Sequence, residues 1–298
     1  SGLSTGVIAG LPSALITGFS SAQIQGLNPL QMSVLTPSQV NALSPSQWSQ
    51  INGAQFSALS PSTVAGIGVA QVSQLNASQL QFLNPSQMGA MNAQQLATFN
   101  PTQISSMNPV AFSGLSNLQV RSLGNAFLQA MNSDQVGAIP PAQVSALNSS
   151  QLASFKPSQI GALTAPQVSS LSANQMASLQ ASQISALRPS ALSALVPQQM
   201  DGLSGTQIQA FLPIQIAALP TGVISALSMG QVSALTIPQL QSLTLSQVSA
   251  LQANQIAVLD VNSLSAFSSV QIGAVSPSQV VGLNKTQLSS LSAEQISG

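Results

Sequence analysis

Apolar residues recur along this chain at two positions in every eight. Stepping by eight from Ile24 to Ile296, all 35 positions are apolar, and the position three residues further on, from Leu27 to Leu291, is apolar in all 34 cases. Two looser units, residues 4–11 and 12–19, keep the same phase, and no residue is inserted or deleted in the frame. A repeat with so constant a period predicts a repeating architecture in which each unit packs against its neighbours.

The polar positions of the unit predict where a helix begins. In residues 36–43, Thr36 is suited to be the N-cap, Pro37 to be the first helical residue, and Gln39 to complete a capping box by bonding the N–H of the cap residue. Val40 and Leu43 are three residues apart and would lie on one face of that helix. The next cap, Ser44, follows at once.

Two other backbone structures are alternatives to short helices. A single long helix is disfavoured because eight residues advance it by about 80° beyond two turns, and each interior proline would cost about 3 kcal/mol. In a β-solenoid, Val40 and Leu43 would point to opposite faces of a strand unless each unit contained a corner. We therefore predict an all-α solenoid of very short helices of about two turns, one per eight-residue repeat, with a β-solenoid as the alternative.

The frame predicts one uninterrupted array over residues 1–298, about 37 units long, without a domain boundary. The chain begins at Ser1 without Met and stops at Gly298, one residue short of a complete unit. We expect it to be a segment of a longer chain. Beyond Pro140 the cap position holds poor cap formers such as Lys156, Gln180 and Leu212, so the second half is expected to be less regular.

The composition argues against most chemistry. Only four basic and four acidic residues occur among 298, and there is no His, Cys or Tyr. The basic residues are too few to neutralise phosphates, which argues against nucleic acid as a partner. The acids, Asp134, Asp201, Asp260 and Glu294, are scattered, and a Ser-His pair or a His/Cys metal site has no residues to build it. We expect no enzymatic activity and no cofactor or metal site. No run of apolar residues approaches the ~20 that a membrane-spanning helix needs.

The strongest polar signal is a column of glutamines, which fill 29 of the 35 positions from residue 23 to residue 295, counted in steps of eight. Glu would serve a capping box equally well, yet it never occupies this column. We interpret the column as a poorly hydrated stack in which like charges would repel and neighbouring neutral amides bond one another; capping alone is the alternative. The first ten members are Gln23, Gln31, Gln39, Gln47, Gln55, Gln71, Gln79, Gln87, Gln95 and Gln103.

Three cap positions also belong to N-glycosylation sequences, Asn-X-Ser/Thr. They are Asn76-Ala77-Ser78, Asn148-Ser149-Ser150 and Asn284-Lys285-Thr286.

The charge balance suggests what kind of protein this is. A surface with zero formal net charge promotes association, so we expect it to be covered by sheath or filament proteins, by its own copies, or by glycans. The favoured function is a structural, non-catalytic rod that forms the axis of an extracellular filament and templates its sheath. An adhesin stalk or a ligand-binding solenoid is the alternative.

In its length, its Ser and Pro content and its scarcity of charge, the whole chain resembles the axial protein of algal mastigonemes, the hairs on flagella. That resemblance implies an extracellular, glycosylated, membrane-anchored chain at the centre of a flagellar appendage, with a second protein wound around it.

Overall fold

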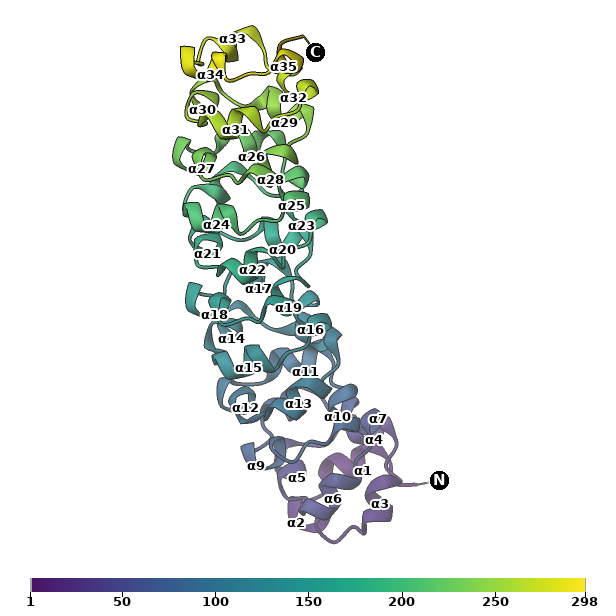
Figure 1. The fold of residues 1–298 in the computed structure, drawn as a ribbon. Helices are drawn as coiled ribbons and strands as arrows, with labels where there is room; N and C mark the ends of the chain where they lie inside the picture. Colours follow the sequence, from purple (N-terminus) through teal and green to yellow (C-terminus); the bar gives the residue numbers. More distant parts are fainter. Residues whose placement is uncertain (1, 298) are drawn as a thin grey trace. The chain divides into compact units, whose positions relative to one another are not determined.

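The computed structural model describes residues 2–297 and contains helices but no strand in that range. The all-α prediction is therefore confirmed for the described residues, and the β-solenoid alternative is set aside. The chain forms two compact units, Ser1–Leu147 and Asn148–Gly298. Each is a solenoid of short helices, and each is described by itself below (Figure 1).

The helices of the first unit follow one another with only two to four residues between them. They are α1 Thr5–Gly10, α2 Ser13–Ile16, α3 Ser21–Gln25, α4 Pro29–Ser33, α5 Pro37–Asn41, α6 Pro45–Gln50, α7 Gly53–Ser57, α8 Pro61–Ala65, α9 Val69–Val72, α10 Ala77–Gln81, α11 Pro85–Ala90, α12 Ala93–Thr98, α13 Pro101–Ser106, the 3₁₀ helix η1 Pro109–Gly114, α14 Asn117–Ser122, α15 Asn125–Ala130, α16 Ser133–Gly137 and α17 Pro141–Val144.

The second unit continues with helices of the same kind. They are α18 Ser149–Ala153, α19 Pro157–Ile160, α20 Ala165–Ser169, α21 Ala173–Ala177, α22 Ala181–Ile184, α23 Pro189–Leu192, the 3₁₀ helix η2 Pro197–Met200, α24 Gly205–Gln209, α25 Pro213–Ala218, α26 Thr221–Ala226, α27 Met229–Ser233, α28 Ile237–Gln241, α29 Leu245–Ala250, α30 Ala253–Ala257, α31 Val261–Ser265, α32 Ser269–Gly273, α33 Pro277–Val280, α34 Lys285–Ser289 and α35 Ala293–Ser297.

Helix α6 shows how eight residues build one unit. The Ser44 hydroxyl accepts the main-chain N–H of Gln47 at 3.3 Å, and the Ser44 N–H donates to Gln47 Oε1 at 2.8 Å. Pro45 is the first helical residue, and the helix ends at Gln50 because Ile51 is extended (φ −64°, ψ 118°). At six residues, this helix is shorter than the two turns expected, because the extended residues are needed to reach the next cap.

Poor cap residues in the second unit do not abolish the helices that follow them. The N–H of Lys156 donates to Gln159 Oε1 at 2.8 Å, and that of Leu212 donates to Gln215 Oε1 at 2.6 Å. This half of the capping box needs only the main chain of the cap residue, so it survives any side chain except proline. The helix pattern therefore continues where a less regular second half was expected.

Within each unit, a helix packs on the one three places further along the chain. In the first unit α1, α4, α7 and α10 form such a series, and in the second α24, α27, α30 and α33 do (Figure 1). Side-chain bonds described below reach 28 to 31 residues back, into the fourth preceding repeat. One turn of the solenoid therefore takes more than three repeats and fewer than four, and successive turns lie directly on one another.

The two apolar positions of each repeat form the interior. Val40 and Leu80 are fully buried, as are the large rings of Trp48 and Phe56, which meet edge-on with centroids 6.2 Å apart. Trp48 Nε1 donates to the carbonyl of Gln71 at 3.0 Å, so the ring is a satisfied core residue. Each such side chain contributes about 1.5–3 kcal/mol by burial, and much of that offsets the cost of ordering its repeat.

Candidate functional site

The glutamine column lies at the third residue of the helices, and most of its amides are used at both ends. The oxygen accepts the N–H of the preceding cap residue in nine of the ten predicted members: Gln23, Gln31, Gln39, Gln47, Gln55, Gln79, Gln87, Gln95 and Gln103. The exception is Gln71, which follows a glycine cap and instead donates to the carbonyl of Asn41 at 3.0 Å.

The amide nitrogen of the column reaches the preceding turn of the solenoid. Gln55 Nε2 donates to the carbonyls of Ile24 and Leu27 at 2.9 and 2.8 Å, and Gln95 Nε2 donates to those of Val64 and Ile67 at 2.9 and 2.8 Å. The expected bonding between neighbouring amides is thus replaced here by bonding to the main chain. Gln23, near the start of the described residues, is exposed.

This geometry explains why glutamate is missing from the column. A carboxylate would still cap its own helix, but it has no N–H to offer the carbonyls of the preceding turn. Gln39 is 2 % exposed and Gln87 is fully buried, so a carboxylate there would be desolvated and would face carbonyl oxygens. The column position therefore requires a side chain that can donate a hydrogen bond. Repulsion between like charges in a stack is not the only reason for the absence of glutamate.

Two positions that lack glutamine satisfy the same carbonyls in other ways. Thr63 donates its hydroxyl to the carbonyl of Leu35, 28 residues back, at 2.6 Å. Where Ala111 replaces glutamine, the main chain itself moves in, and the N–H of Asn108 donates to the carbonyl of Leu80 at 3.1 Å. Neither substitution could be interpreted from sequence, because the partner lies one full turn away.

One glutamine shows what happens when the cap residue is proline. Gln143 follows Pro140, which has no N–H to give, and Gln143 Oε1 is buried without a hydrogen-bond partner in the described residues. At Pro220 the column residue is instead Val223, which is fully buried and needs no partner. A proline cap therefore leaves the glutamine oxygen of its own repeat without its usual N–H partner.

The charged residues all lie on the surface. All eight side chains are exposed, and no cluster of three or more acidic, His or Cys residues occurs in residues 2–297. The N–H of Ser263 donates to Asp260 Oδ1 at 2.7 Å and holds the pKa of that carboxyl below its ordinary value of 3.8. Asp260 thus acts as a helix cap. None of the described helices has the length and apolar character needed to cross a bilayer.

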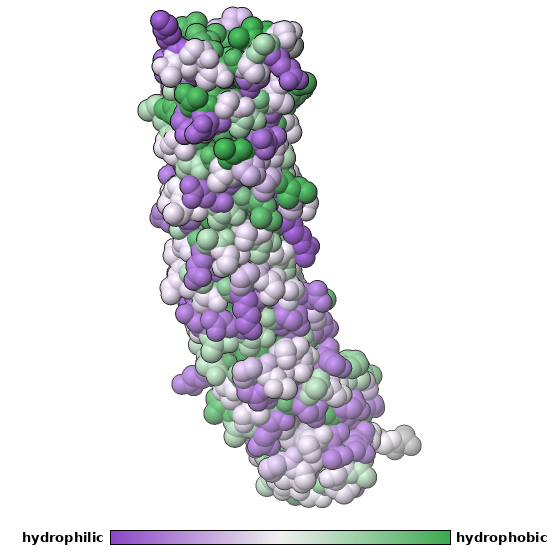
Figure 2. Space-filling view, in the orientation of Figure 1, coloured by the Kyte–Doolittle hydropathy of each residue, from purple (hydrophilic) through white to green (hydrophobic). Residues whose placement is uncertain are grey.

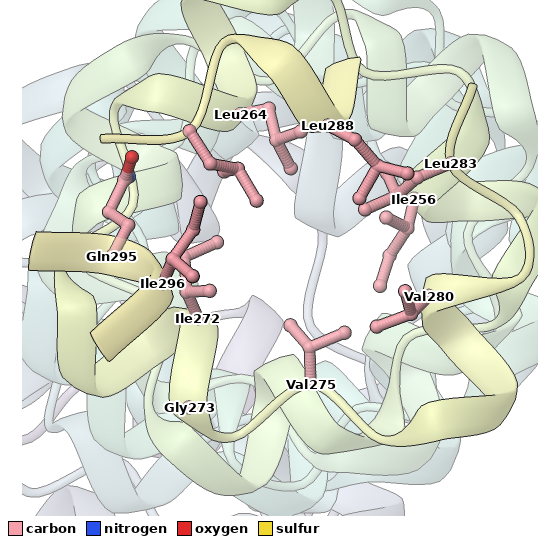
Figure 3. Close-up of a pocket in the computed structure, with 11 residues that line it drawn as sticks. Ile256, Leu264, Ile272, Gly273, Val275, Val280, Leu283, Leu288, Gln295 and Ile296 are labelled. Carbon is pink, nitrogen blue, oxygen red and sulfur yellow. The ribbon is translucent and has the colours of Figure 1, made fainter. Parts of the chain in front are cut away.

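A cavity of about 240 Å³ opens in the last turns of the second unit. Figure 3 shows aliphatic side chains from several helices pointing into it, among them Ile256, Val275, Val280 and Leu288. Gln295, a member of the column, is the polar side chain at its edge. The cavity continues the apolar interior, and its lining offers van der Waals contact with few polar groups to orient a ligand.

The outer surface mixes polar and apolar residues (Figure 2). Exposed aliphatic residues recur in the first turn of the helices: Leu30, Val69, Val110, Leu118, Ile214, Met229, Ile237, Leu245, Val261 and Val270. Scattered singly, exposed aliphatic residues are ordinary on a protein surface. Here, ten of the twenty exposed large apolar side chains are the first or second residue of a helix.

Three surface grooves also occupy one part of the repeat. Each lies between a cap residue and the cap residue 24 positions later, on the next turn. The pairs are Asn76 with Asn100, Thr244 with Ser268, and Asp260 with Asn284, beside grooves of about 350, 590 and 460 Å³. Sequence reasoning missed these grooves because they join residues that only the number of repeats per turn brings together.

The three sequon asparagines act as helix caps through their oxygens. Asn76, Asn148 and Asn284 accept the main-chain N–H three residues later at 3.0, 2.8 and 3.0 Å. Asn148 and Asn284 are exposed, and Asn76 is half-buried.

No family model matches the chain, and no curated protein matches it.

Proposed function

We propose that this chain is a structural, non-catalytic scaffold on the axis of an extracellular filament, where its repeating surface templates a sheath of partner subunits. The observation that carries the proposal is the recurrence of one groove at one place in the repeat, between cap residues 24 positions apart. A surface that repeats offers many equivalent sites, which suits an ordered coat of identical subunits better than a single ligand.

Two further features support this role. Column glutamines tie each turn to the one before it, so the spacing of the grooves within a unit is fixed by hydrogen bonds. The surface carries only eight charges and exposes aliphatic residues at recurrent positions, which favours a covered state over a bare one. The extracellular location and the flagellar appendage belong to the proposal through the resemblance to mastigoneme axial proteins.

Electron microscopy of native assemblies, isolated with an antibody against this chain, tests the proposal. We expect a continuous central density enclosed by regularly spaced subunits of a larger filament. A bare stalk that ends in a head would contradict the scaffold and favour an adhesin, and a discrete particle would favour a ligand-binding module.

A further inference from the structure

Three helix caps of this chain combine a sequon with an amide nitrogen that the fold does not use. In Asn76, Asn148 and Asn284 the side-chain oxygen accepts the capping bond, while Nδ2 has no hydrogen-bond partner among the described residues. At two other cap asparagines this nitrogen is used, since Nδ2 of Asn84 donates to the carbonyl of Ser57 at 3.3 Å and that of Asn132 donates to the carbonyl of Ser105 at 3.4 Å.

The chemistry of N-glycosylation is compatible with this cap. The amide nitrogen forms a bond to C1 of the sugar, the bond from C1 to the diphosphate of a polyprenyl-linked oligosaccharide breaks, and the nitrogen loses one proton. The carbonyl oxygen is untouched and remains an acceptor. A glycosylated asparagine can therefore keep its capping bond, which contributes about 1 kcal/mol.

Exposure separates the three asparagines. Asn148 and Asn284 are exposed, as are the hydroxyl residues of their sequons, Ser150 and Thr286. Asn76 is half-buried in its groove. Asn284 lies at the edge of the groove lined by Val261, and Val281, three residues earlier, is 85 % exposed.

We propose that Asn148 and Asn284, and not Asn76, carry N-linked oligosaccharides. The assignment rests on the proposed extracellular location, because this modification is made on the secretory pathway. At Asn284 the oligosaccharide would project from the groove beside Val261 and cover an apolar part of the surface. The surface carries few charges to keep the protein soluble.

The test is to direct the 298-residue chain into the secretory pathway of a eukaryotic cell behind an added signal, and to analyse lysate and medium together. We expect peptide N-glycosidase to lower the mass in two steps and to convert Asn148 and Asn284 to aspartate. Ser150→Ala and Thr286→Ala should each remove one glycan while leaving the capping asparagine in place.

The chain supplies a matched control at Asn100-Pro101-Thr102, where proline blocks the sequon. Asn100 is exposed and caps through its oxygen at 2.9 Å, so Pro101→Ala should add a third glycan without loss of the helical circular dichroism signal. Unmodified Asn148 and Asn284 would overturn the assignment, and equal occupancy at Asn76 would overturn its basis in exposure. A sheathed filament built from an unglycosylated chain would leave the scaffold proposal standing, so the two failures are distinguishable.

Discussion

At the scale of single residues, the fold depends on glutamine, whose side-chain amide carries a hydrogen-bond donor and an acceptor at a fixed separation. The glutamine oxygen completes the start of its own helix, and the nitrogen joins that helix to the preceding turn. The oxygen's role follows from the sequence, because cap and glutamine are three residues apart. The nitrogen's role does not, because its partners are 28 to 31 residues away and their identity depends on how many repeats make a turn.

Replacing glutamine by glutamate tests the need for a donor. We expect Gln39→Glu to cost about 2–4 kcal/mol in the free energy of unfolding at pH 7, because a buried carboxylate would face the carbonyls of Ile8 and Leu11. Gln39→Ala should cost about 1–3 kcal/mol, because it leaves those carbonyls without a donor but buries no charge. Gln23→Glu is the control, since Gln23 has the same capping box but is exposed. Equal costs at Gln39 and Gln23 in urea melts would contradict the donor role.

Restoring a cap should stabilise the repeat that lacks one. Pro140→Ser supplies both an N–H for the orphaned Gln143 Oε1 and a hydroxyl for the N–H of Gln143. We expect a net gain of about 1 kcal/mol, after the loss of proline's entropic advantage of about 0.4–1 kcal/mol. Pro140→Ala, which supplies only the N–H, should gain less. A lower melting temperature for the serine variant would show that Gln143 is satisfied in another way.

The Asp260 cap predicts a local dependence on pH. Its pKa is lowered in the folded protein by the N–H of Ser263, so its ionised form stabilises α31 above the unfolded pKa, near 3.8. That contribution is lost as the pH falls through the lower, folded value. A carboxyl titration by NMR should give a pKa below 3.8, and Asp260→Asn should keep the cap without this dependence. A measured pKa at or above 3.8 would exclude the capping bond in solution.

At the scale of helices, the repeat sets where each helix starts, while the neighbouring turn sets how closely it packs. The start signals and the buried pair in each repeat follow from residues next to one another in sequence, whereas the helices, at four to six residues, are shorter than the two turns predicted. The closest approach does not. At η1 the main chain of Gly114 lies against the carbonyl of Pro85 in α11, where an added Cβ would stand 1.9 Å from the oxygen. The small residue before Leu115 is typical of the repeat and indicates close packing, but nothing in the sequence identifies Pro85 as its partner.

A methyl group tests this contact. Gly114→Ala should destabilise the first unit by about 1–3 kcal/mol, because η1 must move away from α11. Gly230→Ala in α27 is the control, because a Cβ there meets nothing within 4 Å. It should be neutral or stabilise its helix by up to about 1 kcal/mol. If thermal melts showed the same shift for both variants, close packing of η1 would not be the reason for the glycine.

At the scale of the whole chain, the contacts between turns require an eight-residue repeat without insertions or deletions. The sequence predicts one array over residues 1–298, while the structure describes two compact units, each with the same register between turns. The turn length of between three and four repeats could not be predicted, because it depends on the angles at the extended joints between helices. Those joints consist of ordinary Leu, Ile and Ser residues whose torsions no local motif fixes.

A shift of frame should therefore cost more than the loss of any single contact. Deleting Ser38 displaces the cross-turn partners of Gln39, Gln47 and Gln55, all of which reach back past that position. We expect a loss of several kcal/mol, more than the loss of about 1–3 kcal/mol for Gln39→Ala. Deleting the whole repeat, residues 36–43, keeps the frame and should cost less than removing Ser38 alone. If the single deletion left the melting curve unchanged, the packing of successive turns would not depend on the repeat frame.

The bonds from glutamine to the preceding turn also determine how such a solenoid would respond to tension. Each turn is held by its own small set of contacts to the turns on either side, so pulling on one unit would detach turns one after another at a nearly constant force. A turn of about 28 residues releases roughly 90 Å of chain as it peels away. Adding repeats would increase the total extension without increasing the unfolding force, so a longer array would absorb more mechanical energy.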